Sequence, residues 1–228
     1  MIIAHRGIHN NKDIPENSLL AFKIAIERKY AIEFDIEITK DSKLVIHHDD
    51  NLKRMTGVNK KVENLTLEEI RKLKLLGTDY GIPTLAEVLN LVDGNVLLDI
   101  EIKSTKRVKD VVNLVLKELE NYKGLVQIKS FDPFIVNRLK KVTNKYKIGL
   151  LIMEHSSNKG LNFLVKSKLI YLTKFDFLAV HKKMLNERFY NKYIKKYPLY
   201  AWTFNGIDEA NNFIKKYPKV ICICNDLD

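Results

Sequence analysis

Short apolar runs recur along the chain, and several of them end abruptly in charged residues. The first run, Met1 to Ala4, is followed at once by His5-Arg6-Gly7 and is too short to form a helix. The runs at 32–38, 44–47 and 96–102 also carry or end in charged groups. Runs of this length are typical of buried strands. Charge gathered at the ends of several buried strands indicates a site at those ends.

Strand-like runs alternate with segments of helical periodicity. We expect strands at 2–6, 32–38, 96–102, 125–129, 147–152, 175–180, 199–204 and 220–224. We expect helices at 19–28, 105–121, 132–143, 160–170, 185–196 and 207–216. Strict alternation implies a parallel sheet covered by helices. Eight such units in about 250 residues is the size of a (β/α)8 TIM barrel, so this α/β fold is predicted rather than an open sheet.

The stretch from about residue 50 to residue 82 breaks this alternation. Thr66 and Glu69 have the spacing of a capping box at the start of a short helix. We interpret the stretch as a small insertion after the second strand region, lying over the strand ends, and predict one catalytic domain over residues 1–228. Leu44 to His47 follows a polar turn and is expected to pair with the strand at 32–38 as a hairpin.

Composition narrows the class of protein. The net charge is +11, but the lysines are spread along helical stretches, which favours a solvated surface over a nucleic-acid partner. No apolar stretch is long enough for stable membrane insertion, and no secretion signal precedes the first strand, so we expect a cytoplasmic protein. Cys222 and Cys224 share one face of a strand and are interpreted as small core residues. The oligomeric state is left open.

Carboxylates lie at the predicted strand ends. Glu33 and Asp35 are two residues apart and point the same way, and Glu101 comes from the next barrel strand. Active sites of such barrels lie at the C-terminal ends of the strands, where three converging carboxylates would repel one another unless they were protonated or a cation were bound. Oxygen ligands favour Mg²⁺ or Ca²⁺ over zinc. The alternative is a set of internal ion pairs with Arg6 and Lys103.

Two histidines fall beside these acids in the predicted site. His5 and His48 would flank the metal, and an imidazole can accept a proton from an attacking hydroxyl or donate one to a leaving oxygen. The guanidinium of Arg6 suits phosphate oxygens. His47 should point to the opposite face and pack. A place in the site is less strongly indicated for the remaining histidines, His9, His155 and His181. These residues together indicate a metal-assisted phosphodiesterase.

A series of short motifs carries a family resemblance. In chain order they are His5-Arg6-Gly7, Pro15-Glu16-Asn17-Ser18, Glu33-Phe34-Asp35, His48-Asp49 followed by Leu52 and Arg54-Met55-Thr56-Gly57, Ile82-Pro83-Thr84-Leu85, Ile100-Glu101-Ile102-Lys103, Ser130-Phe131-Asp132-Pro133 and Trp202-Thr203-Phe204-Asn205. Each motif alone is weak, but the ordered set spans nearly the whole chain. It resembles the glycerophosphodiester phosphodiesterase family.

The resemblance implies a role for each matching position. Glu33, Asp35 and Glu101 match the family's ligands for one divalent cation, Mg²⁺ or Ca²⁺. His5 and His48 match its general acid and base. The expected substrate contacts are Arg6, Lys103, Asn17 and Trp202. The small-molecule substrate would be a glycerophosphodiester, cleaved to glycerol 3-phosphate and an alcohol through a cyclic phosphate. The chain departs from the family at its last strand, where Cys222 to Asn225 stand in place of a glycine-rich segment, while Asp226 matches the aspartate of the family's Thr-Asp pair.

Two other functions compete with this one. The same site could act on a lysophospholipid, as a lysophospholipase D does, or on a glycerol-phosphate polymer; Leu73, Leu75 and Leu76 in the insertion favour a greasy substrate. A non-catalytic barrel could instead bind an anionic polymer or membrane through its lysines, which would make binding strongly salt-dependent. The pair of histidines beside an acid cluster argues against a pure binder. The sequence does not identify the released alcohol.

Overall fold

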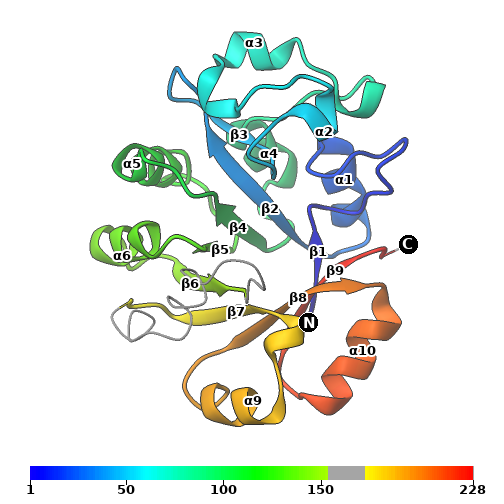
Figure 1. The fold of residues 1–228 in the computed structure, drawn as a ribbon, viewed down its shortest axis with the longest axis vertical. Coiled ribbons are helices and arrows are strands. Elements are labelled where there is room, and N and C mark those ends of the chain that lie inside the picture. Colours follow the sequence, from blue (N-terminus) through cyan, green and yellow to red (C-terminus); the bar gives the residue numbers. More distant parts are fainter. Residues whose placement is uncertain (154–172, 228) are drawn as a thin grey trace.

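The computed structural model describes residues 1–153 and 173–227 (Figure 1). Parallel strands form a closed ring: β1 (Ile2–His5), β2 (Ala31–Ile38), β4 (Leu98–Ile102), β5 (Val126–Ser130), β6 (Lys147–Ile152), β7 (Phe177–His181), β8 (Leu199–Asn205) and β9 (Ile221–Asn225). The ring closes because β1 pairs with both β2 and β9. The predicted TIM barrel is therefore confirmed, with each strand close to its predicted bounds.

Helices surround the barrel (Figure 1). They are α1 (Leu19–Glu27), α4 (Leu85–Val92), α5 (Val108–Glu118), α6 (Pro133–Val142), α9 (Glu187–Tyr193) and α10 (Ile207–Lys216). Helix α1 begins at Ser18, whose side chain accepts the Ala21 N–H. Helix α9 starts later than the predicted 185–196 because Asn186 caps it and a 3-10 turn, η3 (Lys182–Met184), precedes it, and it ends at Tyr193. The helix expected at 160–170, and His155, lie outside the described residues.

The alternation of β2 sorts its side chains between two environments. Ile32, Phe34 and Ile36 belong to the apolar core shared with the outer helices, and the rings of Phe34 and Phe22 of α1 lie 5.6 Å apart. Glu33 and Asp35 lie on the other face of the strand, toward the barrel interior. A second apolar cluster includes Ile3, Leu151, Phe177, Tyr200 and Ile223. These come from β1 and β6 to β9, so the charged part of the interior lies on β2, β4 and β5.

The insertion follows the hairpin strand β3 (Leu44–Ile46), which pairs antiparallel with β2. It contains α2 (Lys53–Thr56), η1 (Val62–Asn64), α3 (Leu67–Arg71) and η2 (Leu75–Gly77) and lies at one edge of the barrel (Figure 1). The capping box of Thr66 and Glu69 is confirmed. Leu75 is buried in an apolar cluster of the insertion, and Leu73 and Leu76 pack against it. These leucines therefore pack within the insertion, so they no longer favour an apolar substrate such as a lysophospholipid.

The expectation for the two cysteines is confirmed by the described residues. Cys222 and Cys224 are buried and unpaired, as small core residues would be. Across the described ranges, we find no helix with both the length and the apolar character that crossing a bilayer requires.

Candidate active site

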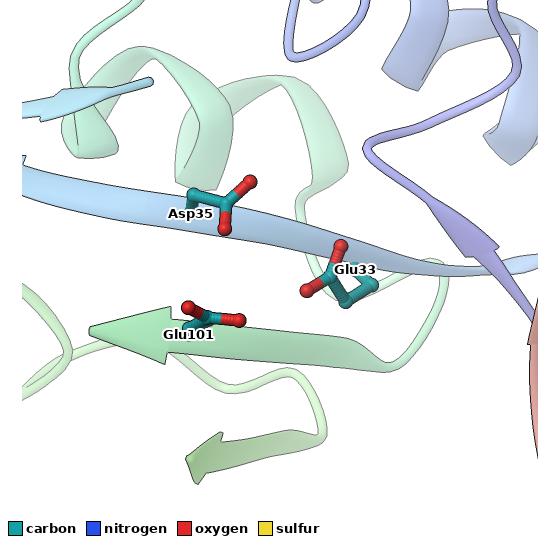
Figure 2. Close-up of side chains that lie close together, drawn as sticks. All are labelled: Glu33, Asp35 and Glu101. Atoms are coloured by element: carbon teal, nitrogen blue, oxygen red, sulfur yellow. The ribbon is translucent and has the colours of Figure 1, made fainter. Parts of the chain in front are cut away.

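Three carboxylates meet inside the barrel, as predicted (Figure 2). Asp35 of β2 pairs in register with Glu101 of β4, and Glu33 lies two residues earlier on the same strand. One carboxylate oxygen from each residue lies within 4.8 Å of the others. Glu33, Asp35 and Glu101 are only 2%, 1% and 6% exposed. Buried acids this close together need either a compensating positive charge or a proton on one of them.

Part of that charge comes from Lys103 and Arg6. The Lys103 Nζ lies 2.8 Å from Glu101 and 3.3 Å from Asp35, and the Arg6 Nε lies 3.5 Å from Asp35. The internal ion pairs considered from the sequence therefore exist. Burial opposes ionisation of Asp35, but Lys103, His48 and Arg6 hold the pKa of that carboxyl well below its usual range. Burial raises the pKa of Glu101 to about 7, because Lys103 offsets it only in part.

The donor set fits a hard divalent cation. It consists of carboxylate oxygens, which Mg²⁺ and Ca²⁺ prefer. Asn17 adds a further oxygen: its Nδ2 donates to Asp35 at 3.0 Å, and its buried Oδ1 has no hydrogen-bond partner in the described part of the chain. An unpartnered buried oxygen and a carboxyl with a raised pKa are two features that a bound cation would satisfy.

The two predicted histidines border the same pocket as Glu33 and Glu101. His5 Nδ1 donates to Asn225 Oδ1 at 2.7 Å, and His48 Nδ1 donates to Asp49 Oδ1 at 2.7 Å. Each ring is thus fixed through Nδ1, which leaves Nε2 for chemistry. Burial lowers the pKa of His5 to about 4, although Glu33, 4.0 Å from its Nε2, acts in the opposite direction.

The His5-Arg6-Gly7 sequence makes the turn that ends β1. Arg6 and Gly7 have φ values of 57° and 80°, in the left-handed region that favours glycine. A Cβ on Gly7 would also lie 2.8 Å from the Ala21 backbone, so no larger residue fits there without a shift. The turn brings the Arg6 N–H to Glu33 at 3.2 Å and the Arg6 side chain to Glu16 at 2.7 Å.

Trp202 of β8 lies on the apolar wall of this pocket, with Phe131 and Leu151. Its ring meets Phe131 edge-on at 5.6 Å and His181 at 5.2 Å. His181 thus packs against this wall. His47 is buried, as expected for a packing residue. Glu37 follows Asp35 on β2 but borders a separate cavity with Asp50 and Glu63.

Lys129 is a site residue that the sequence analysis missed. It is 1% exposed, and its Nζ lies 2.6 Å from Asp99 and 3.2 Å from Glu33. Gln127 donates to Asp99 at 2.9 Å and accepts the Tyr200 hydroxyl at 2.9 Å. Burial opposes a charged lysine, but Asp99 and Glu33 raise the Lys129 pKa. Polar Gln127 and Lys129 alternate with apolar neighbours, which places both side chains on one face of β5, and the contacts with Asp99 show that this face points inward.

The comparisons with known proteins agree with this geometry. Residues 5–226 match the model of the glycerophosphoryl diester phosphodiesterase family, which spans nearly the whole chain. The chain belongs to this family.

Individual proteins are also similar to this chain. A glycerophosphodiester phosphodiesterase of Caldanaerobacter subterraneus is 39% identical over 66% of this chain and 66% of its own length. A rat lysophospholipase D, GDPD1, is 35% identical over 50% of this chain and 40% of its own length. These matches therefore span less than two thirds of either relative. A phosphodiesterase of Oleispira antarctica, solved with the product sn-glycerol-3-phosphate, has the same fold, with a TM-score of 0.83 and 20% identity over 98% of this chain and 92% of that one.

Proposed function

We propose that the protein is a metal-dependent phosphodiesterase that hydrolyses glycerophosphodiesters to glycerol 3-phosphate and an alcohol. The observation that carries this proposal is the buried cluster of Glu33, Asp35 and Glu101, bordered by His5 and His48 in one pocket. Family membership supports the reaction class. The glycerol 3-phosphate in the Oleispira antarctica structure supports the product.

The carboxylates would hold one divalent cation, Mg²⁺ or Ca²⁺. When bound, such an ion supplies positive charge where negative charge grows on the phosphoryl oxygens. Arg6 and Lys103 would add two further cations toward the same oxygens, since both already lie beside Asp35. Asn17, which donates to Asp35, would contact the substrate, and Trp202 would cover the apolar part of the substrate.

The two histidines would carry the protons. One imidazole takes the proton of the glycerol hydroxyl next to the phosphodiester while that oxygen bonds to phosphorus. The other donates a proton to the alcohol oxygen as its bond to phosphorus breaks, which leaves a cyclic phosphate. Water then opens the ring with the two roles reversed. His5, neutral at pH 7, suits the first proton acceptance, and His48, bonded to the Asp49 carboxylate, suits the donation.

A lysophospholipid is the second candidate substrate. The apolar wall of Trp202, Phe131 and Leu151 and the similarity to a rat lysophospholipase D favour it. The reaction at phosphorus would be unchanged, and only the contacts to the apolar part of the substrate would differ.

Phosphorus NMR of the products tests the function and the role of the neighbouring hydroxyl together. The substrates would be glycerophosphoethanolamine, an analogue without that hydroxyl, and a lysophospholipid. We expect glycerol 3-phosphate from the first, with a transient cyclic phosphate, and no turnover of the second. Turnover of the analogue would contradict the cyclic route. Faster turnover of the lysophospholipid than of glycerophosphoethanolamine would favour the second candidate.

A further inference from the structure

Arg54 lies in helix α2 of the insertion, and its guanidinium bonds two carboxylates at once. It donates to the two oxygens of Glu16 at 2.6 and 3.0 Å and to the two oxygens of Asp49 at 2.6 and 3.1 Å. Both contacts are bidentate, which is the strongest arrangement for an arginine and a carboxylate. Glu16 and Asp49 lie on two different loops, so one side chain of the insertion ties both loops together.

Each of these carboxylates also bonds a residue of the pocket. Glu16 Oε1 accepts the Arg6 Nη1–H at 2.7 Å, and Asp49 Oδ1 accepts the His48 Nδ1–H at 2.7 Å. Arg54 is therefore one carboxylate away from the residue proposed to bind phosphate and one carboxylate away from a residue proposed to move a proton. It borders neither the carboxylate cluster nor the pocket itself among the described contacts.

We infer that Arg54 is a positioning residue that sets the His48 ring and the Arg6 guanidinium together. Through Asp49 it fixes His48 Nδ1, so that Nε2 is presented to the pocket; through Glu16 it fixes Arg6 beside Asp35. This inference rests on the proposed function, because it uses the roles proposed for His48 and Arg6. It also gives the insertion a part in the reaction.

The chemistry requires arginine at this position. A guanidinium is planar and has five donors, so it can meet two carboxylates side by side, whereas a lysine ammonium is a single point charge. Burial opposes ionisation of Glu16 and Asp49, but Arg54 holds the pKa of both carboxyls below their usual range, and that of Asp49 falls to about 2. Both partners therefore stay anionic at neutral pH.

Loss of Arg54 should not unfold the protein. Its side chain is 45% exposed, and Glu16 keeps its bonds to Arg6 and Asn11 without it. The space left by an alanine opens toward solvent, and the guanidinium ion can enter it from solution. This makes Arg54→Ala suitable for chemical rescue.

The test compares Arg54→Ala and Arg54→Lys with the matched control Arg71→Ala. Arg71 is also in the insertion and is ion-paired, 3.2 Å from Glu87, and among the described residues neither Arg71 nor Glu87 lines the pocket. We expect Arg54→Ala to lower kcat by about 10- to 100-fold and to weaken the binding of inorganic phosphate several-fold. Arg54→Lys should recover little of either. Guanidinium chloride below denaturing concentrations should restore part of the kcat of Arg54→Ala and leave Arg71→Ala unchanged.

Nitrogen NMR of the histidine rings separates this inference from the proposed function, because it needs no turnover. We expect His48 to hold a single Nδ1–H tautomer in the wild type and a mixture of tautomers in Arg54→Ala. That change, without catalysis by the wild type, would support the positioning role and contradict only the proposed function. A wild-type enzyme that turns over, with unchanged His48 signals, kcat and phosphate affinity in Arg54→Ala, would overturn the inference. So would an activity loss that merely follows a lower Tm and is not rescued by guanidinium.

Discussion

Replacing Lys129 by methionine removes a buried positive charge while keeping a side chain of similar length. Lys129 is 1% exposed and Asp99 is fully buried, so neither charge can be screened by water in place. In the variant, Asp99 keeps the bond from Gln127, but that amide carries no charge to balance the carboxylate. Glu33 also loses a cation at 3.2 Å. The variant therefore isolates the cost of an unbalanced charge inside the barrel.

The expected cost follows from the burial of the pair. Removing one partner of a buried ion pair destabilises a protein by about 3–5 kcal/mol, because the other charge is left uncompensated. We expect Lys129→Met to lose a free energy of unfolding in this range at pH 7. Lys140 offers a matched control: its Nζ lies 2.8 Å from Asp176, but both side chains are partly exposed. Lys140→Met should lose about 1 kcal/mol or less.

The pH dependence of this loss has a definite sign. Burial raises the pKa of Asp99 even with Lys129 present, and removal of the lysine should raise it further. A carboxyl whose pKa is higher in the folded than in the unfolded protein takes up a proton more readily when folded. Its penalty is therefore absent below the unfolded pKa, near 4, and grows as the pH rises toward the folded pKa. The gap in stability between wild type and Lys129→Met should narrow as the pH is lowered.

Urea unfolding at pH 7 and pH 5 measures both quantities. The double variant Lys129→Met, Asp99→Asn removes the stranded charge, so it should recover much of the lost stability. The reasoning would be refuted if Lys129→Met were within about 1 kcal/mol of the wild type. It would also be refuted if the double variant were no more stable than Lys129→Met alone.

Three further predictions concern the pocket. His5→Ala and His48→Ala should each lower kcat by about 100-fold or more, with a Tm unchanged in circular dichroism melts. Near-full activity of either variant would show that the replaced histidine is not the acid or base. Glu101→Gln should weaken divalent-metal binding by about tenfold or more in calorimetry, while Glu68→Gln, 85% exposed, should not; an unchanged titration would exclude Glu101 as a ligand. The pKa of Glu101 is about 7 without metal, so protons should compete with the cation below pH 7. Metal affinity should therefore fall by about tenfold for each pH unit between pH 7 and pH 5. An affinity that stays constant over this range would contradict the prediction.

The barrel and the carboxylate cluster were predictable because each depends on a local pattern. The apolar run that ends in His5-Arg6 and the run that carries Glu33 and Asp35 each predict both a strand and the polar residues near its end. The barrel topology then brings those strand ends together. Glu101 follows from the same rule on the next barrel strand. No knowledge of side-chain packing is needed for these residues.

The residues that support the site could not be predicted in the same way. Asn225 bonds His5 across 220 positions of the chain, so only the closure of β9 against β1 brings them together. Arg54 lies in an irregular insertion whose path no periodicity sets. Lys129 lies inside a predicted strand. From the sequence, a lysine that points into the barrel cannot be distinguished from an exposed one unless Asp99 is known to face it.

Release of glycerol 3-phosphate from glycerophosphoethanolamine, with and without a chelator, tests the central claim most directly. We predict release by the purified protein, complete loss in the presence of EDTA, and recovery when Mg²⁺ or Ca²⁺ is added in excess. Choline, glycerol and inositol head groups in parallel would rank the alcohols. Release that continues at full rate in EDTA, after the protein is shown to be free of metal, would contradict the metal-dependent account. Absence of release from every substrate by folded, metal-loaded protein would contradict the proposed activity itself.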